Sequence, residues 1–540
     1  MKSKYIFFAV SLFAALSANA QETYENAKLA GEDLNGTARY VGMGGAMEAL
    51  GADISTIGSN PAGIGLFRHS NVSLSAGLLM QSDGKEFSNG KKTNLSFDQI
   101  GGVYTTRTGQ KSFLNFGFNY HKSKNFDYIL NAAGSLNGSS QNKQSYIKGM
   151  LGDQKVGGFN VGKNKDGQNI GYVDAKSSDV AYTWSQIDYL YWNSLIPGSN
   201  GLYNYEKATG YTLDRAHTGY IGNYDFAVSG NLNDRVYLGL TFGMKDVNYK
   251  GYSEYRENLN NAGGVLVRDE RKVTGSGFDI TAGVIVRPVA ESPFRIGAYV
   301  KSPTWYDLTT SNVTRLVYAS GTSSQEKGVP NSPNSYDFKM WTPWKFGFSL
   351  GHTIGNYIAL GATYEYENYA NINSRVNNGG YYDYYYDQYY ESSIPDKNMN
   401  AHTKEVLKGV STLKLGVEYK PVSNVALRAG YNYVSAMYVN NAQKDPGLAS
   451  LGTSYSSTTD YTNWGEINRF TLGVGYQVKK FNIDLAYQYS AQKGSFAPFS
   501  NVKDVTYTSG TTTITESNIA SNTDVKNNRS QLLLTLGYRF

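Results

Sequence analysis

The sequence predicts an all-β protein, a transmembrane β-barrel of fourteen antiparallel strands with a small N-terminal plug, or hatch, in its lumen. Three observations predict this fold class. Apolar and polar side chains alternate along about fourteen segments. The connections between these segments are alternately short and long, and an export signal precedes them all.

The export signal occupies residues 1–20. Lys2 and Lys4 precede an apolar run that ends at Ala18, and Ala18-Asn19-Ala20 has the small-x-small pattern of a cleavage site. We therefore expect residues 1–20 to be a signal peptide that is removed before folding. The chain contains no cysteine, which excludes a lipid-modified cysteine, disulfide bonds and a cysteine-bound metal.

Composition excludes two further classes of protein. The formal net charge is only +6 over 540 residues and no block of like charges occurs, so a nucleic acid is not an expected partner. The mean hydropathy is −0.44, and no later stretch of about eighteen apolar residues predicts a membrane helix. The 46 tyrosines and 59 glycines instead suit aromatic girdles and closely packed strands at a membrane interface.

The strand prediction depends on an alternation with a period of two residues. In residues 481–490, Phe, Ile, Leu, Tyr and Tyr alternate with Asn, Asp, Ala, Gln and Ser. Such a strand turns one face to hydrocarbon and the other to a polar lumen. The same criterion predicts strands at 71–80, 98–107, 112–121, 221–231, 235–248, 274–287, 294–303, 343–352, 356–366, 409–420, 424–436, 467–478, 481–492 and 529–540.

The connections give an independent reason to expect a barrel. Six short gaps alternate with seven long ones, which predicts turns on the periplasmic side, long loops outside and both chain ends in the periplasm. A soluble β-sandwich, the main structural alternative, would mix loop lengths at both ends. We therefore expect a barrel over 71–540 and a hatch over 21–70.

The predicted hatch has two recognisable motifs. Gly42, Gly44 and Gly45 belong to a run of small residues, and the triplet Asn60-Pro61-Ala62 follows as a turn starter. The segment 38–66 resembles the N-terminal hatch of the FadL/TodX family of outer-membrane transporters for hydrophobic compounds, and fourteen strands fit that family's architecture. The resemblance implies passive uptake of long-chain fatty acids or aromatic hydrocarbons.

The resemblance also implies a route. Ligand is gathered among the outer loops, reaches a lumenal site, and leaves sideways through a gap in the wall when the hatch shifts. In the family a kink in the third strand opens this gap. The segment 112–121 contains neither a proline nor an obvious bulge, so the sequence does not predict such an opening.

Catalytic chemistry is not predicted. The five histidines are scattered without metal-ligand spacing, and no nucleophile has a base near it in the sequence, so we expect no enzyme, metal or cofactor.

Two further groups of residues carry predictions. The first is a tyrosine cluster in the long loop 367–408, which consists of Tyr381, Tyr382, Tyr384, Tyr385, Tyr386, Tyr389 and Tyr390. We interpret it as a collar that gathers apolar ligands or, equally, as a loop stiffened by packing. The second is Tyr538 with the terminal Phe540. This pair resembles the signal that the outer-membrane assembly machinery reads, and it is equally the last lipid-facing pair of a strand.

The leading functional hypothesis is therefore a monomeric channel for hydrophobic small molecules in the outer membrane of a Gram-negative cell, surrounded by its lipid and inserted by the assembly machinery. A haem-binding receptor is the alternative in another class, because tyrosine or histidine can ligate haem iron. A general porin is a third hypothesis, and the hatch argues against it.

Overall fold

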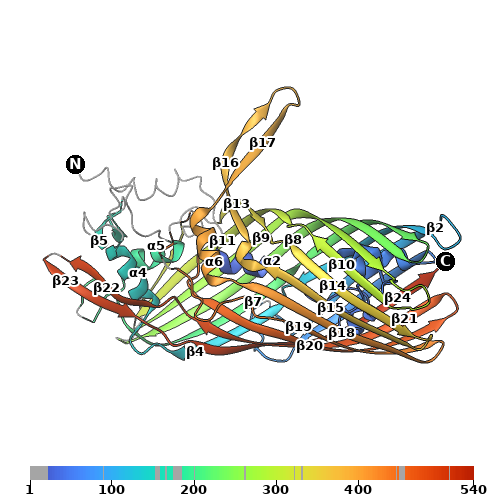
Figure 1. Cartoon of the computed structure of the whole chain (residues 1–540). Helices are drawn as coiled ribbons and strands as arrows, with labels where there is room; N and C mark the ends of the chain where they lie inside the picture. The colour runs from blue at the N-terminus through green and yellow to red at the C-terminus, as the bar shows by residue number, and fades with distance from the viewer. Residues whose placement is uncertain are drawn as a thin grey trace.

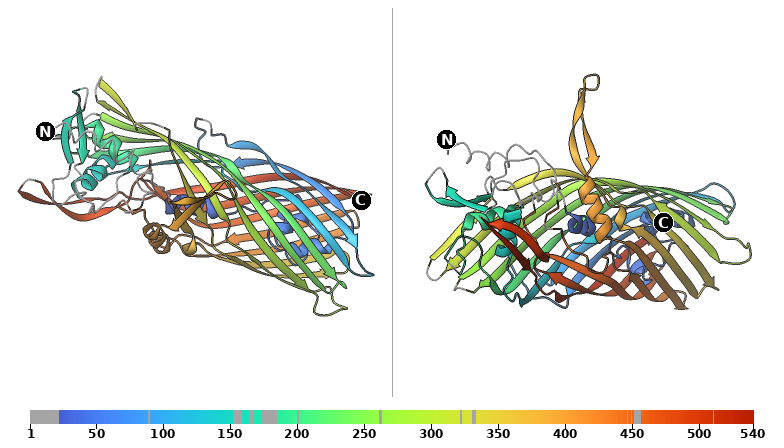
Figure 2. Two further views of the ribbon diagram at one scale, coloured as in Figure 1. Left: turned by 90° about the horizontal axis from the view of Figure 1, so that it is seen from above. Right: turned by 60° about the vertical axis from the view of Figure 1, so that its left-hand side comes forward.

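The computed structural model describes residues 22–540 apart from 89, 152–158, 165–166, 174–184, 200, 261–262, 321–322, 330–332, 446, 449, 451–455 and 510. The predicted signal peptide lies outside the described residues. The chain forms one long barrel with tilted strands, seen from the side in Figure 1 and from two other directions in Figure 2.

The barrel is a closed antiparallel sheet of fourteen strands, as the sequence predicts. Each strand pairs with its neighbours in chain order, and the ring closes where the first strand pairs with the last. The strands are β1 (Asn71–Gln81), β2 (Thr93–Arg107), β3 (Phe113–Asn125), β7 (Ala208–Leu232), β8 (Val236–Leu259), β9 (Gly263–Val286), β10 (Arg295–Lys301), β14 (Lys345–Ile354), β15 (Ile358–Asn368), β18 (Gly409–Val422), β19 (Val425–Val434), β20 (Tyr461–Val478), β21 (Phe481–Ala497) and β24 (Thr523–Arg539).

The alternating side chains face the directions that the sequence predicts. On β21, Phe481, Ile483 and Leu485 are exposed on the outer face, whereas Asp484 and Gln488 are buried. An apolar outer face and a polar inner face are the reverse of a soluble barrel and suit a hydrocarbon surrounding. Because no open sheet edge is tolerated in hydrocarbon, closure of the ring is a physical requirement.

Two strands are broken near prolines. β10 ends at Lys301, and β11 (Trp305–Ser320) continues against β9 after Pro303. Likewise β13 (Asn334–Trp341) leads into β14 across Pro343. Proline has no backbone N–H to donate, so the ladder is interrupted at these positions.

The strands on one side of the barrel extend far beyond the predicted bounds. β7, β8 and β9 have 25, 24 and 24 residues and continue outward past the apolar belt. Together with β4 (Tyr128–Ser135) and β12 (Ser323–Gly328) they form an outer extension of the sheet. Short hairpins at this end are β5 (Phe159–Lys163) with β6 (Asn169–Val173) and β22 (Val502–Ser509) with β23 (Thr512–Asn518).

The helices lie in three places. Those near the N-terminus are α2 (Thr23–Ala30), α3 (Ala38–Gly42), η1 (Ile54–Gly58) and η2 (Pro61–Leu66), and they lie within the barrel (Figure 1). The outer end carries α4 (Gln141–Leu151) and α5 (Gln186–Ser194), and the side wall carries η3 (Tyr369–Asn371) and α6 (Lys397–Val406). Each helix in the described part of the chain is too short or too polar to cross a membrane.

One hairpin leaves the barrel altogether. β16 (Asn373–Asp383) and β17 (Gln388–Pro395) pair with each other and project sideways from the wall (Figures 1 and 2).

Candidate functional site: the barrel lumen

The N-terminal segment, residues 22–70, is enclosed by the barrel and hydrogen-bonded to several of its strands. Thr535 on β24 accepts the backbone N–H of Ala38 at 2.7 Å, and the Thr471 hydroxyl on β20 donates to the Gly42 carbonyl at 3.1 Å. The Thr241 hydroxyl on β8 donates to Ile57 at 2.8 Å. The segment therefore fills the lumen and is held from different directions.

The glycine motif of the N-terminal segment packs directly on wall glycines. Gly44 has φ +61°, and a Cβ added to it would lie 2.8 Å from the Tyr431 backbone nitrogen. On the wall side, Gly430 and Gly416 leave room for the backbone of Met43 and Gly44. Glycine on both sides lets two backbones approach more closely than any side chain permits.

The triplet Asn60-Pro61-Ala62 is seated in the same way on another wall. The Asn60 side chain accepts the N–H of Ala62 at 3.2 Å, which caps η2. A Cβ on Gly283 would collide with this Asn60 side chain, and one on Gly239 would collide with the Pro61 backbone. The structure thus places both sequence motifs of the predicted hatch against glycines of the barrel; a movable hatch remains a prediction.

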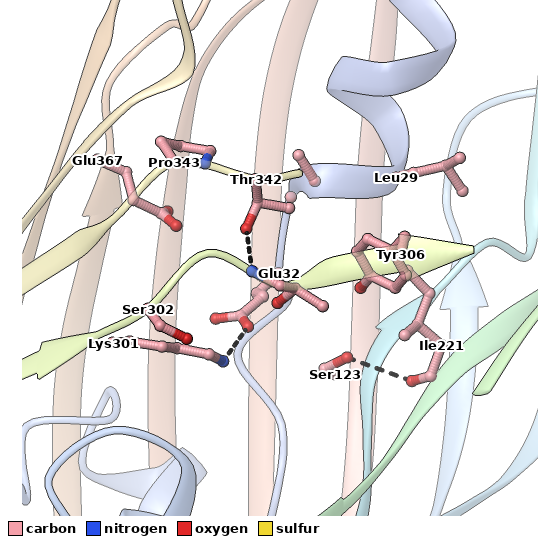
Figure 3. Close-up of a pocket in the computed structure, with 13 residues that line it drawn as sticks. Leu29, Glu32, Ser123, Ile221, Lys301, Ser302, Tyr306, Thr342, Pro343 and Glu367 are labelled. Atoms are coloured by element: carbon pink, nitrogen blue, oxygen red, sulfur yellow. Dashed lines mark hydrogen bonds and ion pairs between the residues drawn. The ribbon is translucent and has the colours of Figure 1, made fainter. Parts of the chain in front are cut away.

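Glu32 forms the centre of a lysine cluster. Its carboxylate lies 2.9 Å from Lys301 Nζ on β10 (Figure 3). It also lies 2.6 Å from Lys345 Nζ on β14 and 4.0 Å from Lys245 Nζ on β8. Asp279 also contacts Lys245 and Lys301, at 3.2 and 3.5 Å. The cluster therefore ties the end of the α2 segment to three strands by charge.

The next residue, Asp33, makes a second cluster with different strands. Its Oδ1 lies 3.8 Å from Lys124 Nζ, 3.7 Å from Arg469 and 3.6 Å from Arg529. The Asp33 backbone N–H also donates to Ser123 O at 2.7 Å. We call Glu32, Asp33 and these six lysines and arginines the ion clasp.

Two small cavities lie beside the ion clasp. The first, about 10 Å³, is bounded by Gly31, Glu32, Lys301 and Tyr306 (Figure 3). The second, about 30 Å³, lies next to Asp33. These volumes suit one or two water molecules, so neither cavity holds a fatty-acid chain in this conformation.

An apolar layer lies next to the ion clasp. Its buried residues come from α2 and from strands around the ring, so it spans the lumen. Ile221 and Tyr306 belong to both this layer and the lining of the first cavity. The aromatic members of the layer are Tyr24, Phe126, Tyr249, Tyr306, Tyr336, Phe338, Tyr369, Tyr438 and Tyr461. A layer of this kind resists ions and water but accommodates apolar molecules.

The barrel wall has a gap between β2 and β3. The two strands pair from Gln99 with His121 to Arg107 with Phe113, but residues 93–97 of β2 pair only with β1. Leu95 in this stretch is 88% exposed. A register shift between Lys122 and Lys124 bends β3 at the same level. The sequence did not predict this opening because the irregularity begins just after 121.

Asn35 of the N-terminal segment bridges the gap. Its side-chain nitrogen donates to Asp98 Oδ1 on β2 at 2.9 Å and to the Lys122 carbonyl on β3 at 3.1 Å. Lys122 Nζ donates across the same gap to Ser96 Oγ at 3.0 Å. Asp98 and Asn35 also line the second cavity, so side chains close the gap where strand pairing stops.

Helices α4 and α5 pack against the outer extension of the sheet. The N–H of Gln141, the first residue of α4, donates to Glu257 Oε1 at 2.8 Å, and the Tyr255 hydroxyl donates to the same oxygen at 2.7 Å. Glu257 lies on β8 well beyond Met244, the last exposed apolar residue of that strand, and hence outside the membrane span. Burial raises the pKa of its carboxyl to about 7.

The other predicted residues lie away from the lumen. All seven tyrosines of the cluster are on the projecting hairpin or its turn, exposed and away from the barrel mouth, so their ligand-gathering role stays a prediction. Tyr538 packs on Phe481 with tilted rings whose centroids are 4.7 Å apart, and Phe540 is exposed at the turn end. Their recognition by assembly machinery also stays a prediction.

The histidines do not form a shared site. His121 lies 3.3 Å from Asp225, His217 bonds to Tyr249 at 2.6 Å, and His402 bonds to Thr23 at 3.0 Å. In the described residues no three His, Asp or Glu side chains are grouped as metal ligands.

The closed antiparallel ring with an apolar outer face defines the class of protein: a β-barrel of the transmembrane type. No family model and no curated protein matches the chain.

Solved structures do match over nearly the whole length. The Ralstonia pickettii toluene transporter TbuX is 12% identical with a TM-score of 0.46, covering 94% of this chain and 99% of that one. The P. putida toluene transporter TodX is 12% identical at a TM-score of 0.45, covering 94% and 99%. A Pseudomonas aeruginosa FadL homologue is 11% identical at 0.47, covering 95% and 100%.

Proposed function

We propose that the protein is a channel of the Gram-negative outer membrane for the passive uptake of hydrophobic compounds such as long-chain fatty acids. The observation that carries this proposal is the combination of an apolar layer across the lumen with a wall gap beside the enclosed N-terminal segment. An apolar molecule that crosses the layer needs an exit that avoids the polar segment below it. The gap supplies that exit toward the lipid.

In this proposal the N-terminal segment acts as a hatch. The ion clasp keeps it beneath the apolar layer, and Asn35 closes the gap by bonding to both β2 and β3. The small cavities mean that the described conformation is a closed one. Displacement of residues 31–35 would widen the path and release both edges of the gap together.

The two alternatives predict different behaviour. A general porin needs an open aqueous lumen, whereas here ion-paired side chains and residues 22–70 fill it. A haem receptor needs an exposed axial ligand, and the projecting tyrosines are among the exposed candidates. Titration with haemin against competition by a fluorescent fatty acid separates this alternative from the proposal.

The deciding test is Asn35→Ala, which removes the bridge but leaves the ion clasp. We expect faster uptake of radiolabelled oleate in cells without their own fatty-acid channel, and unchanged single-channel ion conductance, because the exit is lateral. Asn260→Ala, exposed just after the outer end of β8, is the matched control. Unchanged oleate uptake, or oleate uptake no greater than in cells carrying an empty vector, would contradict the proposal.

A second test addresses the hatch itself. Deleting residues 21–66 should leave a folded barrel with increased ion leak, because the ring of β-strands closes without this segment. Conductance that is unchanged by the deletion would count against a lumenal hatch.

A further inference from the structure

The tyrosine finger, defined as residues 373–395 with β16, β17 and their turn, is the most exposed aromatic feature of the chain. Its seven tyrosines are between 37% and 89% exposed, with Tyr384 and Tyr385 at the upper end. Aromatic side chains are not left in water at this density without a partner. The finger therefore indicates a surrounding that is absent from the isolated barrel.

The base of the finger lies just above the lipid-facing belt. Phe346 and Phe348 on β14 face outward in that belt, and the exposed Trp344 precedes them at its rim. Three residues earlier, the Trp341 ring lies beneath the guanidinium of Arg375, 4.1 Å from it, at the base of the finger. At about 3.3 Å per residue this base is roughly 10 Å from the rim.

The finger extends from this base into the space outside the barrel wall. It projects sideways from the wall and away from the mouth of the barrel (Figures 1 and 2). Arg375 fixes the base through hydrogen bonds to Ser393 Oγ at 3.0 Å and Ser393 O at 2.6 Å. The tyrosines are thus held over the outer headgroup layer rather than over the pore.

Both faces of the finger are aromatic. Tyr381 pairs with Tyr390, with stacked rings 5.3 Å apart, and the next pair along the ribbon is Tyr382 with Tyr389. Neighbouring pairs on a ribbon point to opposite faces. A rigid protein partner would cover one face of the ribbon and leave the other exposed to water. A layer of lipid headgroups surrounds the ribbon and covers both faces.

The edges of the finger also call for polar partners on both sides. β16 pairs with β13 only at 373–375, and beyond these residues the described pairs join β16 and β17 to each other. A two-stranded ribbon is marginally stable alone in water, and its free edges present unpaired N–H and C=O groups. Sugar hydroxyls can bond to such groups, and sugar ring faces can pack on tyrosine.

The charge of the finger selects among headgroups. Residues 376–395 contain Asp383, Asp387 and Glu391 and no lysine, arginine or histidine. Lys339 on β13 lies 3.5 Å from Glu391, so the negative charge of the outer part of the finger comes from Asp383 and Asp387. A ribbon with a net negative charge is repelled by lipid phosphates. Neutral sugars are not repelled, and their hydroxyls can hydrogen-bond to the acidic side chains of the ribbon. Tyrosine itself favours the membrane interface because it joins an apolar ring to a polar hydroxyl.

We infer that the tyrosine finger binds the saccharide headgroups of the outer-leaflet glycolipid around the barrel. This inference rests on the proposed outer-membrane location but not on the transported compound. It assigns the finger to anchoring and orienting the barrel in its membrane.

The absence of cysteine in the chain allows a direct test. Tyr385→Cys, labelled with an environment-sensitive fluorophore, gives a single probe at the tip, and Leu202→Cys, exposed in an outer loop, is the matched control. Each full-length protein is placed in membranes of phospholipid alone, phospholipid with complete lipopolysaccharide, or phospholipid with lipid A that keeps its phosphates but lacks core sugars. Quenching by neutral acrylamide reports the exposure of the probe.

We expect complete lipopolysaccharide to reduce quenching at 385 at least twofold relative to phospholipid, with no reduction in lipid A and none at 202. A probe at Gln388→Cys should lose most of its protection when Tyr384→Ser, Tyr385→Ser and Tyr386→Ser are added to the same protein. Equal quenching in all three membranes, equal protection by lipid A, or protection already present in detergent would overturn the inference. Normal oleate uptake in the same samples would show that the proposed function stands independently.

Discussion

Replacing Glu32 by glutamine tests whether charge holds the N-terminal segment in the closed position. Glu32 is the only acidic residue of that segment within 4.0 Å of Lys245, Lys301 or Lys345 among the described ion pairs. Glu32→Gln keeps the shape of the side chain but leaves these three lysines with one carboxylate fewer. The change should therefore weaken the local attachment of residues 29–35 and leave the barrel strands paired.

The expected magnitude follows from the partial burial of the pair. Removing one partner of a fully buried ion pair costs about 3–5 kcal/mol. The Glu32 side chain is 37% exposed, so solvent screening reduces this cost to roughly 1–3 kcal/mol. At about 1.4 kcal/mol per factor of ten, the open population should rise about 5-fold to 140-fold.

Hydrogen exchange measures this opening directly. The Asp33 amide is hydrogen-bonded to Ser123 O at 2.7 Å, so its exchange requires the segment to detach. We expect exchange across 29–35 to accelerate by the stated factor in Glu32→Gln. Glu326→Gln, which removes an exposed pair with Arg315, should leave it unchanged. Exchange within twofold of the parent protein would refute an electrostatic attachment.

Two further predictions concern packing and pH. Gly44→Ala should destabilise the closed segment by about 2–4 kcal/mol in exchange measurements, because a Cβ would lie 2.8 Å from backbone at a φ of +61°. The control is Gly379→Ala, at φ +69° with nothing within 4 Å, which carries only the backbone strain of about 1–2 kcal/mol and should not affect the N-terminal segment. Equal destabilisation of that segment by the two substitutions would contradict the packing argument. Burial in the folded protein raises the pKa of the Glu257 carboxyl to about 7. The folded state therefore favours the protonated carboxyl, so the attachment of α4 is strongest at low pH. The equilibrium constant for this attachment should fall about tenfold per pH unit between 4.5 and 7. Glu257→Gln should abolish this dependence of α4 exchange, and a pH dependence that survives it would contradict the assignment.

The strand pattern could be predicted because the membrane imposes it residue by residue. In 481–490 every second side chain faces lipid, and each can be assigned without knowing its partner. The outer extensions of β7, β8 and β9 follow a different rule, since both of their faces meet protein or water. Their polar sequences therefore resembled loops, and the predicted bounds of these strands were too short on the outer side.

The lumenal site depends on long-range geometry that local patterns do not contain. Glu32 meets Lys301 and Lys345 because the ring brings β10 and β14 together at one depth. Nothing near Glu32 in the sequence marks those lysines as its partners. The glycines of 42–45 and the triplet at Asn60 were visible as motifs, but the wall glycines opposite them were indistinguishable from other strand glycines.

The seam between β1 and β24 has a consequence for biogenesis. The first strand of the ring bonds to the last over its whole length, from Asn71 with Arg539 to Gln81 with Arg529. The cylinder is therefore incomplete until the final residues have been synthesised and delivered. Because residues 22–70 lead directly into β1, they can settle against the curved sheet while it is still open, and zippering of the seam then encloses them without any threading.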